Sequence, residues 1–133
     1  MALECKVFRD VSTFETRGGL PYRVGITSET AGSTGISMHE VTIPPGGRAR
    51  AHRHGGHESV LYVVSGEAEM WWGERLENCM KVGPGDLIYV PPGCPHVSVN
   101  RSATAAIVGV VARTEPTADE TVVLMPELDS LVP

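Results

Sequence analysis

The chain has 133 residues, of which 41% are hydrophobic and 20% are charged, a composition typical of one folded domain and unlike that of a disordered chain. Its net charge is −5 and it has no basic stripe, which argues against nucleic acid as a partner because phosphate binding relies on Lys and Arg. The longest apolar run, 105–112, spans eight residues, far fewer than the roughly 20 that a membrane helix needs, so we expect no membrane partner.

The cysteines indicate a reducing compartment. Cys5, Cys79 and Cys94 are odd in number and show no C-x-x-C spacing, which favours free thiols. The N-terminal residues lack the charged and then apolar pattern of a secretory signal. We therefore expect a cytoplasmic protein.

Short segments rich in Val, Ile, Tyr and Trp alternate with clusters of glycine and proline. Such segments are typical of half-buried strands, and no window of helical length shows the apolar spacing of an amphipathic helix. In chain order the predicted strands are 36–43, 58–64, 68–72, 86–90, 96–99, 105–111 and 121–124. The sequence therefore predicts an all-β fold, either a sandwich or a small antiparallel barrel.

The whole chain, 1–133, is predicted to form a single domain. Its core is expected at about 36–112, followed by a C-terminal strand and tail over 114–133. Residues 1–17 are interpreted as an N-terminal docking arm. Its expected apolar contacts are Val7, Phe8, Val11 and Phe14.

Histidines are concentrated just before the second predicted strand. His52 and His54 are two residues apart, so on an extended strand both imidazoles point to the same face. Glu58 follows closely. Neutral nitrogen donors with one anionic oxygen are suited to a divalent transition metal, whereas the alternative is a solvated polar loop beside Gly55 and Gly56.

A second pattern lies downstream and has the form G-x5-P-x-G-x2-H-x3-N. Its residues are Gly85, Pro91, Gly93, His96 and Asn100. Together the two patterns resemble the paired motifs of the cupin superfamily, in this order and over about 55 residues. The first motif, G-x5-H-x-H-x3/4-E-x6-G, is matched by Gly46, His52, His54, Glu58 and Gly66, with one irregularity in spacing.

The resemblance implies a single-domain cupin, a small antiparallel β-barrel of jelly-roll or double-stranded β-helix type, with its site inside the barrel. It also implies that His52, His54, Glu58 and His96 hold one divalent transition metal, with Fe, Mn, Ni and Zn as the candidates. Water or substrate would occupy the remaining coordination positions.

The irregularity concerns the third ligand. Seven residues, rather than six, separate Glu58 from Gly66. Counted back from Gly66 with strict alternation, Ser59 faces inward and Glu58 faces outward. Ser59 is therefore a pocket candidate. A β-bulge near Glu58 would restore the register and turn Glu58 inward. His57 is in phase with Ser59 and is the competing ligand. A three-histidine site is the third possibility, in which His57 is a candidate general acid or base.

Three further residues are candidates for the pocket wall. Arg50 precedes the histidines and is a candidate to clamp a carboxylate or phosphate. In the pair formed by Trp71 and Trp72, one indole faces the barrel and the other faces outward, and Trp72 is the pocket candidate. Cys94 lies two residues before His96 and is either a pocket thiol or a small apolar residue.

Cupins include dioxygenases, sugar and sugar-phosphate isomerases and binding proteins, so the resemblance leaves the reaction open. The resemblance favours a metal-dependent enzyme, a dioxygenase or an isomerase, that acts on a small oxygen-rich metabolite. The alternative is a non-catalytic cupin that binds a metal or a small ligand. We also expect a homodimer, because exposed aromatic residues on the strands are typical of subunit contacts.

Overall fold

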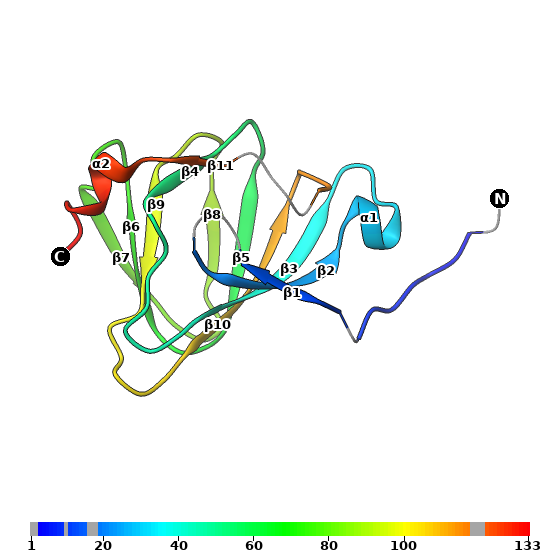
Figure 1. Ribbon diagram of the computed structural model, residues 1–133, viewed down its shortest axis with the longest axis horizontal. Coiled ribbons are helices and arrows are strands. Elements are labelled where there is room, and N and C mark those ends of the chain that lie inside the picture. Colours follow the sequence, from blue (N-terminus) through cyan, green and yellow to red (C-terminus); the bar gives the residue numbers. More distant parts are fainter. Residues whose placement is uncertain (1–2, 10, 16–18, 118–121) are drawn as a thin grey trace.

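Antiparallel strands form nearly all of the regular structure in residues 3–9, 11–15, 19–117 and 122–133, the part of the chain that this computed structural model describes (Figure 1). The two helices are single turns of four residues each. The elements are β1 (Thr13–Glu15), β2 (Pro21–Ile26), α1 (Ser28–Ala31), β3 (Ser37–Ile43), β4 (His52–His54), β5 (Ser59–Ser65), β6 (Ala68–Trp72), β7 (Asn78–Val82), β8 (Leu87–Val90), β9 (His96–Val99), β10 (Ile107–Arg113), β11 (Val122–Leu124) and α2 (Pro126–Asp129).

The strands form two sheets. One has the order β1-β2-β3-β10-β5-β8 and the other β11-β4-β9-β6-β7, and each recorded strand pair is antiparallel. The all-β prediction is therefore confirmed. No helix among the described residues is both long and apolar enough to span a bilayer.

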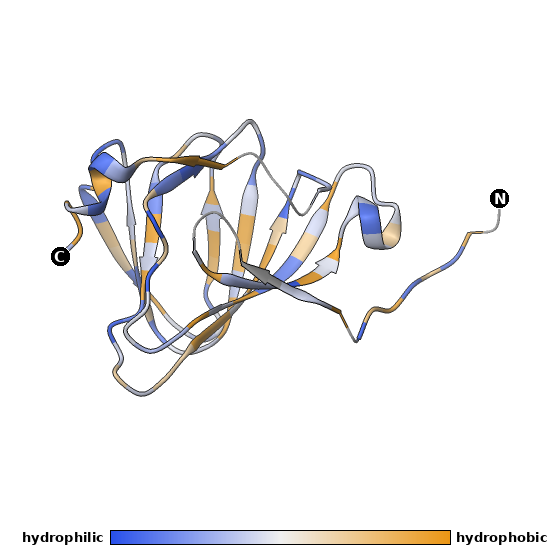
Figure 2. Cartoon of the chain, viewed as in Figure 1, coloured by the Kyte–Doolittle hydropathy of each residue, from blue (hydrophilic) through white to orange (hydrophobic). Residues whose placement is uncertain are grey.

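The core lies between the sheets and follows from alternation along the strands. In β10 every second residue from Ile107 to Arg113 is buried, and β3 repeats this pattern over Ser37–Ile43. Apolar residues recur along the strands of both sheets (Figure 2). Because the side-chain period of a strand is two, each strand directs one set of residues into the interior.

The two ends of the chain differ. Residues 3–9 form no regular structure and extend away from the barrel (Figure 1). Val7 is 66% exposed, and the side chain of Phe14 lies outside the described residues; the docking role expected for residues 1–17 stays a prediction. At the other end Arg48 donates to the carbonyls of Asp129 and Val132, at 3.2 and 3.1 Å, which holds the C-terminal residues against the barrel.

Candidate metal centre

Three histidines from two neighbouring strands meet at one end of the barrel interior. His52 and His54 lie on β4, and His52 is paired with His96 on β9. One ring nitrogen from each residue lies within 4.8 Å of the others. The spacing of two residues places both β4 imidazoles on one face, and the cross-strand pairing brings the third ring beside them.

The backbone orients two of these rings. The Nδ1 atom of His96 donates to the carbonyl of Cys94 at 2.9 Å, and that of His52 donates to the carbonyl of Arg50. A carbonyl oxygen only accepts hydrogen bonds, so Nδ1 carries a proton in both rings. Metal-binding histidines use this arrangement, in which the second nitrogen is fixed by a carbonyl.

His96 is also held in the form that binds metals. Burial lowers the pKa of its imidazole well below the usual value, and the neighbouring His52 and His54 lower this pKa further. The neutral ring is the form that can donate a lone pair to a metal. His96 can therefore offer a neutral nitrogen to a metal.

Glu58 does not join this group, in contrast to the metal-ligand prediction made for it. Its side chain is exposed, and its Oε2 accepts a hydrogen bond from the hydroxyl of Tyr89 at 2.6 Å. The register shift in β5 lies opposite Val108 and Gly109, where Val64 is the extra residue. The irregularity therefore lies at the far end of the strand from Glu58, and the expected bulge near Glu58 is not found.

Ser59 occupies the inward position instead. It is 3% exposed and lines the cavity between the sheets. Its hydroxyl has no hydrogen-bond partner among the described residues. The structure thus presents a buried hydroxyl where the motif, counted back from Gly66, would place a carboxylate.

His57 is buried and packs close to the group without completing it. Its ring centroid lies 5.3 Å from that of His54, but none of its atoms belongs to the cluster of three nitrogens. His57 does not line the cavity between the sheets. Its expected role in acid–base catalysis is not tested by this geometry.

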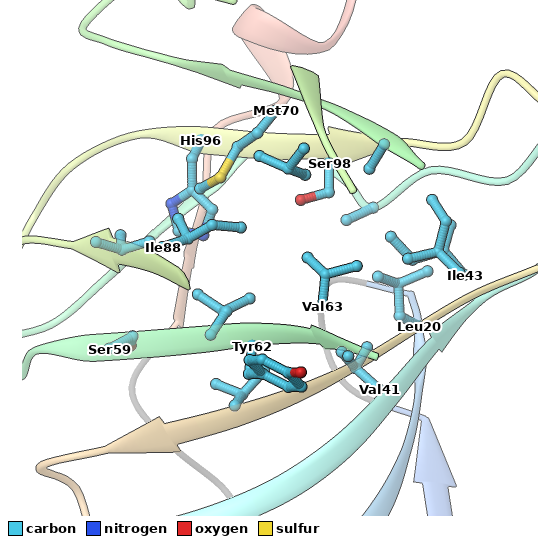
Figure 3. Close-up of a pocket in the computed structure, with 18 of the residues that line it drawn as sticks. Leu20, Val41, Ile43, Ser59, Tyr62, Val63, Met70, Ile88, His96 and Ser98 are labelled. Atoms are coloured by element: carbon cyan, nitrogen blue, oxygen red, sulfur yellow. The ribbon is translucent and has the colours of Figure 1, made fainter. Parts of the chain in front are cut away.

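Two cavities reach the histidines. The first has a volume of about 90 Å³, lies between the sheets and is lined by all three histidines. His96 and Met70 lie on strands of the five-stranded sheet, and Ser59 and Ile88 lie on neighbouring strands of the six-stranded sheet that faces it (Figure 3). The second, of about 330 Å³, is lined by His96 together with the predicted pocket residues Trp72 and Cys94. Arg50 is exposed and lines neither cavity.

Arg113 is the residue that sequence reasoning missed. It is 3% exposed and lines the first cavity with the histidines. It ends the alternating strand β10, two residues beyond the predicted strand end at 111. Extending the alternation of Ile107, Gly109 and Val111 by one more step would have directed Arg113 inward.

A family model described as "Cupin domain" matches residues 39–112. A germin-like protein, subfamily T member 3, from Arabidopsis thaliana is 33% identical over 72 residues, which cover 53% of this chain and 32% of that protein. The match thus spans about a third of that curated relative.

Two solved structures share the fold at lower identity. The oxalate decarboxylase of Lactobacillus farciminis superposes with a TM-score of 0.73 at 20% identity, over 93% of this chain and 36% of that one. The polyketide cyclase RemF of Streptomyces resistomycificus superposes with a TM-score of 0.70 at 22% identity, over 96% of this chain and 92% of that one. Together these matches confirm the predicted jelly-roll, double-stranded β-helix barrel.

Proposed function

This chain belongs to the cupin domain family, and we propose that it is an enzyme that holds one divalent transition metal and acts on a small, oxygen-rich metabolite. The observation that carries the proposal is the group of three ring nitrogens within 4.8 Å of one another. Solved structures with this fold include enzymes, namely a decarboxylase and a cyclase.

The residues fit a metal. His52, His54 and His96 each offer an imidazole nitrogen, and backbone carbonyls accept hydrogen bonds from two of the rings. Imidazole suits Fe, Ni and Zn, and a site with three protein ligands leaves positions open; Mn is the fourth candidate. When bound, the metal would supply Lewis acidity toward a carbonyl or hydroxyl oxygen.

The surrounding residues define what the cavity can do. Apolar side chains such as Val63, Met70 and Ile88 line it and exclude bulk water, which strengthens electrostatic interactions inside. Ser59 offers a hydroxyl to a bound molecule. His57, beside His54, is the proposed acid or base, and a dioxygenase or an isomerase is compatible with this set.

The test is metal content and affinity. We expect elemental analysis of protein purified without chelator to find close to one divalent metal per chain. Replacing His52, His54 or His96 by Ala should remove it, because each variant loses one of three donors. Glu58→Gln should retain the metal, since its carboxylate faces Tyr89. His57→Gln is the matched control, because it replaces a histidine outside the group of three and should leave the metal content unchanged.

Two outcomes would contradict the assignment. Full metal occupancy in the folded His96→Ala protein would exclude the three-histidine site. Weaker metal binding in Glu58→Gln than in His57→Gln would place the carboxylate among the ligands. A metal-loaded protein without O₂ uptake or isomerase activity on hydroxy and keto metabolites would favour the binding-only alternative.

A further inference from the structure

The second cavity lies between the edge strands of the two sheets. β7 and β8 are the last strands in the five-stranded and six-stranded orders, and residues of both line this cavity, together with residues of β6 and β9. Its volume of about 330 Å³ exceeds the 90 Å³ of the first cavity, and the two share His96, Met70 and Val90. A molecule in the second cavity would therefore lie against one of the three candidate metal ligands.

Trp72 forms an aromatic wall beside the histidines. The pairing of β6 with β9 places Trp72 opposite His96, and the pairing of β4 with β9 places His52 opposite the other side of His96. Residues paired in this way share a face of the sheet, so the indole lies in one row with two of the imidazoles. Trp72 is 39% exposed, which leaves part of its ring accessible to a bound molecule.

Two methionines continue this wall. Met70 precedes Trp72 by two residues on β6 and is paired with Met80 on β7, so all three side chains lie on the same face of the five-stranded sheet. Figure 3 shows Met70 and His96 on neighbouring strands of this sheet. Methionine sulfur makes favourable contacts with aromatic rings, and the flexible side chain adapts to the shape it packs against. The wall thus offers an indole and two thioethers to a flat apolar group.

The lining of the second cavity carries no charged side chain. None of the described residues that line it is Asp, Glu, Lys or Arg. Val90 and Pro91 line it from the end of β8, and Cys94 lines it from the turn before β9. Because an unpaired charge is costly to bury, the cavity suits an uncharged group. A cavity of about 150 Å³ holds benzene, so this one has room for a substituted ring.

We infer that the second cavity binds an aromatic ring of the substrate, and that the substrate is an uncharged hydroxylated aromatic compound with a ring hydroxyl toward His96. Contacts with the indole of Trp72 and with the sulfur atoms of Met70 and Met80 favour a planar aromatic ring over a saturated ring of similar size. The inference names the substrate class and rests on the proposed function only for the metal, since the contacts to the ring come from residues outside the three-histidine group.

The experiment titrates phenol and cyclohexanol, which are close in size and each carry one hydroxyl, into protein labelled at the methionine methyl groups and observed by NMR. An aromatic ring current shifts the signals of nearby methyl groups, so we expect phenol to shift those of Met70 and Met80. Met38, on the exposed outer face of the six-stranded sheet, should stay unchanged and is the internal control. Phenol should bind at least about threefold more tightly than cyclohexanol, because the saturated ring loses the aromatic contacts.

Variants of the two neighbouring tryptophans test the aromatic wall. Trp72→Leu should weaken phenol binding by about threefold or more and cyclohexanol binding by less, whereas Trp72→Phe keeps a ring and should bind phenol with nearly unchanged affinity. Trp71→Leu is the matched control, because Trp71 lines neither cavity. Each variant is first checked for native circular dichroism. The comparison of phenol with cyclohexanol uses the unmodified chain, so it tests the inference even if Trp72→Leu does not fold.

Zinc loading tests the position of the hydroxyl. Zinc-loaded protein should bind phenol a few-fold more tightly than metal-free protein, because a hydroxyl beside His96 lies next to the open positions of a metal held by three protein ligands. Equal phenol affinities in the two forms would overturn the placement of the hydroxyl.

The remaining outcomes separate the inference from the proposed function. Equal affinities for phenol and cyclohexanol, or methyl shifts at Met38 in place of Met70 and Met80, would overturn the ring pocket. Unchanged phenol affinity in folded Trp72→Leu would do the same. Shifts at Met70 and Met80 in a protein that takes up no metal would support the pocket and refute the metal centre. Normal metal uptake without these shifts would overturn the pocket and leave the metal centre in place.

Discussion

Replacing Asn100, the last residue of the second motif, by Ala should destabilise the barrel strongly without touching the histidines. Its side-chain amide donates to the carbonyls of Ile43, Pro44 and Ala105, at 3.1, 3.1 and 2.8 Å. Its Oδ1 accepts from the backbone N–H of Ser102 at 3.0 Å. One side chain thus joins the loop after β3 to the loop between β9 and β10.

The magnitude follows from these four contacts. A hydrogen bond contributes about 0.5–1.5 kcal/mol net, and a buried group left without a partner costs about 1–3 kcal/mol. Asn100 is 1% exposed, so water does not readily replace it. We expect Asn100→Ala to lower the free energy of unfolding by about 3 kcal/mol, a large share of the roughly 5–15 kcal/mol typical of a domain.

The assay is urea unfolding followed by circular dichroism and tryptophan fluorescence. Asn78→Ala is the matched control, because the side-chain amide of Asn78 donates to the carbonyl of Trp72 at 3.3 Å near the surface. Asn78→Ala should lower the free energy of unfolding by less than about 1 kcal/mol. Equal unfolding free energies for the two variants would refute the view that Asn100 holds the two loops together.

Further predictions concern a glycine, a carboxylate and a surface. Gly66→Ala should lower the melting temperature more than Gly32→Ala. Both glycines have positive φ, but a Cβ on Gly66 would lie 2.6 Å from a backbone oxygen, whereas a Cβ on Gly32 would lie in open space. Equal melting temperatures would contradict this. Glu58→Gln should lower the pKa of Tyr89, which the hydrogen bond to Glu58 raises; an ultraviolet titration unchanged by the substitution would exclude the contact. We expect the protein to sediment with a mass of twice 14.2 kDa, and Tyr62→Arg on the exposed face should lower this mass; a monomer mass at micromolar concentration would rule out the homodimer.

Strands bounded by glycine and proline could be predicted from the sequence to within two residues. The predictions for 68–72 and 96–99 coincide with β6 and β9. β2 is absent from the predicted strands: Pro21–Ile26 begins with proline and includes a charged residue and a glycine, and its pairing with β3 depends on residues more than ten positions away. β7 is also absent from the predicted strands; its residues alternate between exposed and partly buried, and Cys79 and Lys81 are exposed.

The site was predictable where it depends on local spacing. The interval of two between His52 and His54, and the motif around His96, identified the three residues that the structure brings together. The orientation of Glu58 depends on where β5 absorbs an extra residue, and this is decided by pairing with β10. Spacing alone therefore left the third ligand open.

The position of the extra residue at Val64 bears on how such a centre could change during evolution. Since strand alternation has a period of two, loss of one residue between Ser59 and Val63 would move Glu58 into the inward position that Ser59 holds. The substitution Ser59→Glu would bring a carboxylate to the same place without changing the length. A donor set of three histidines and one with an added carboxylate thus differ, in this barrel, by one residue deleted or one residue substituted in β5.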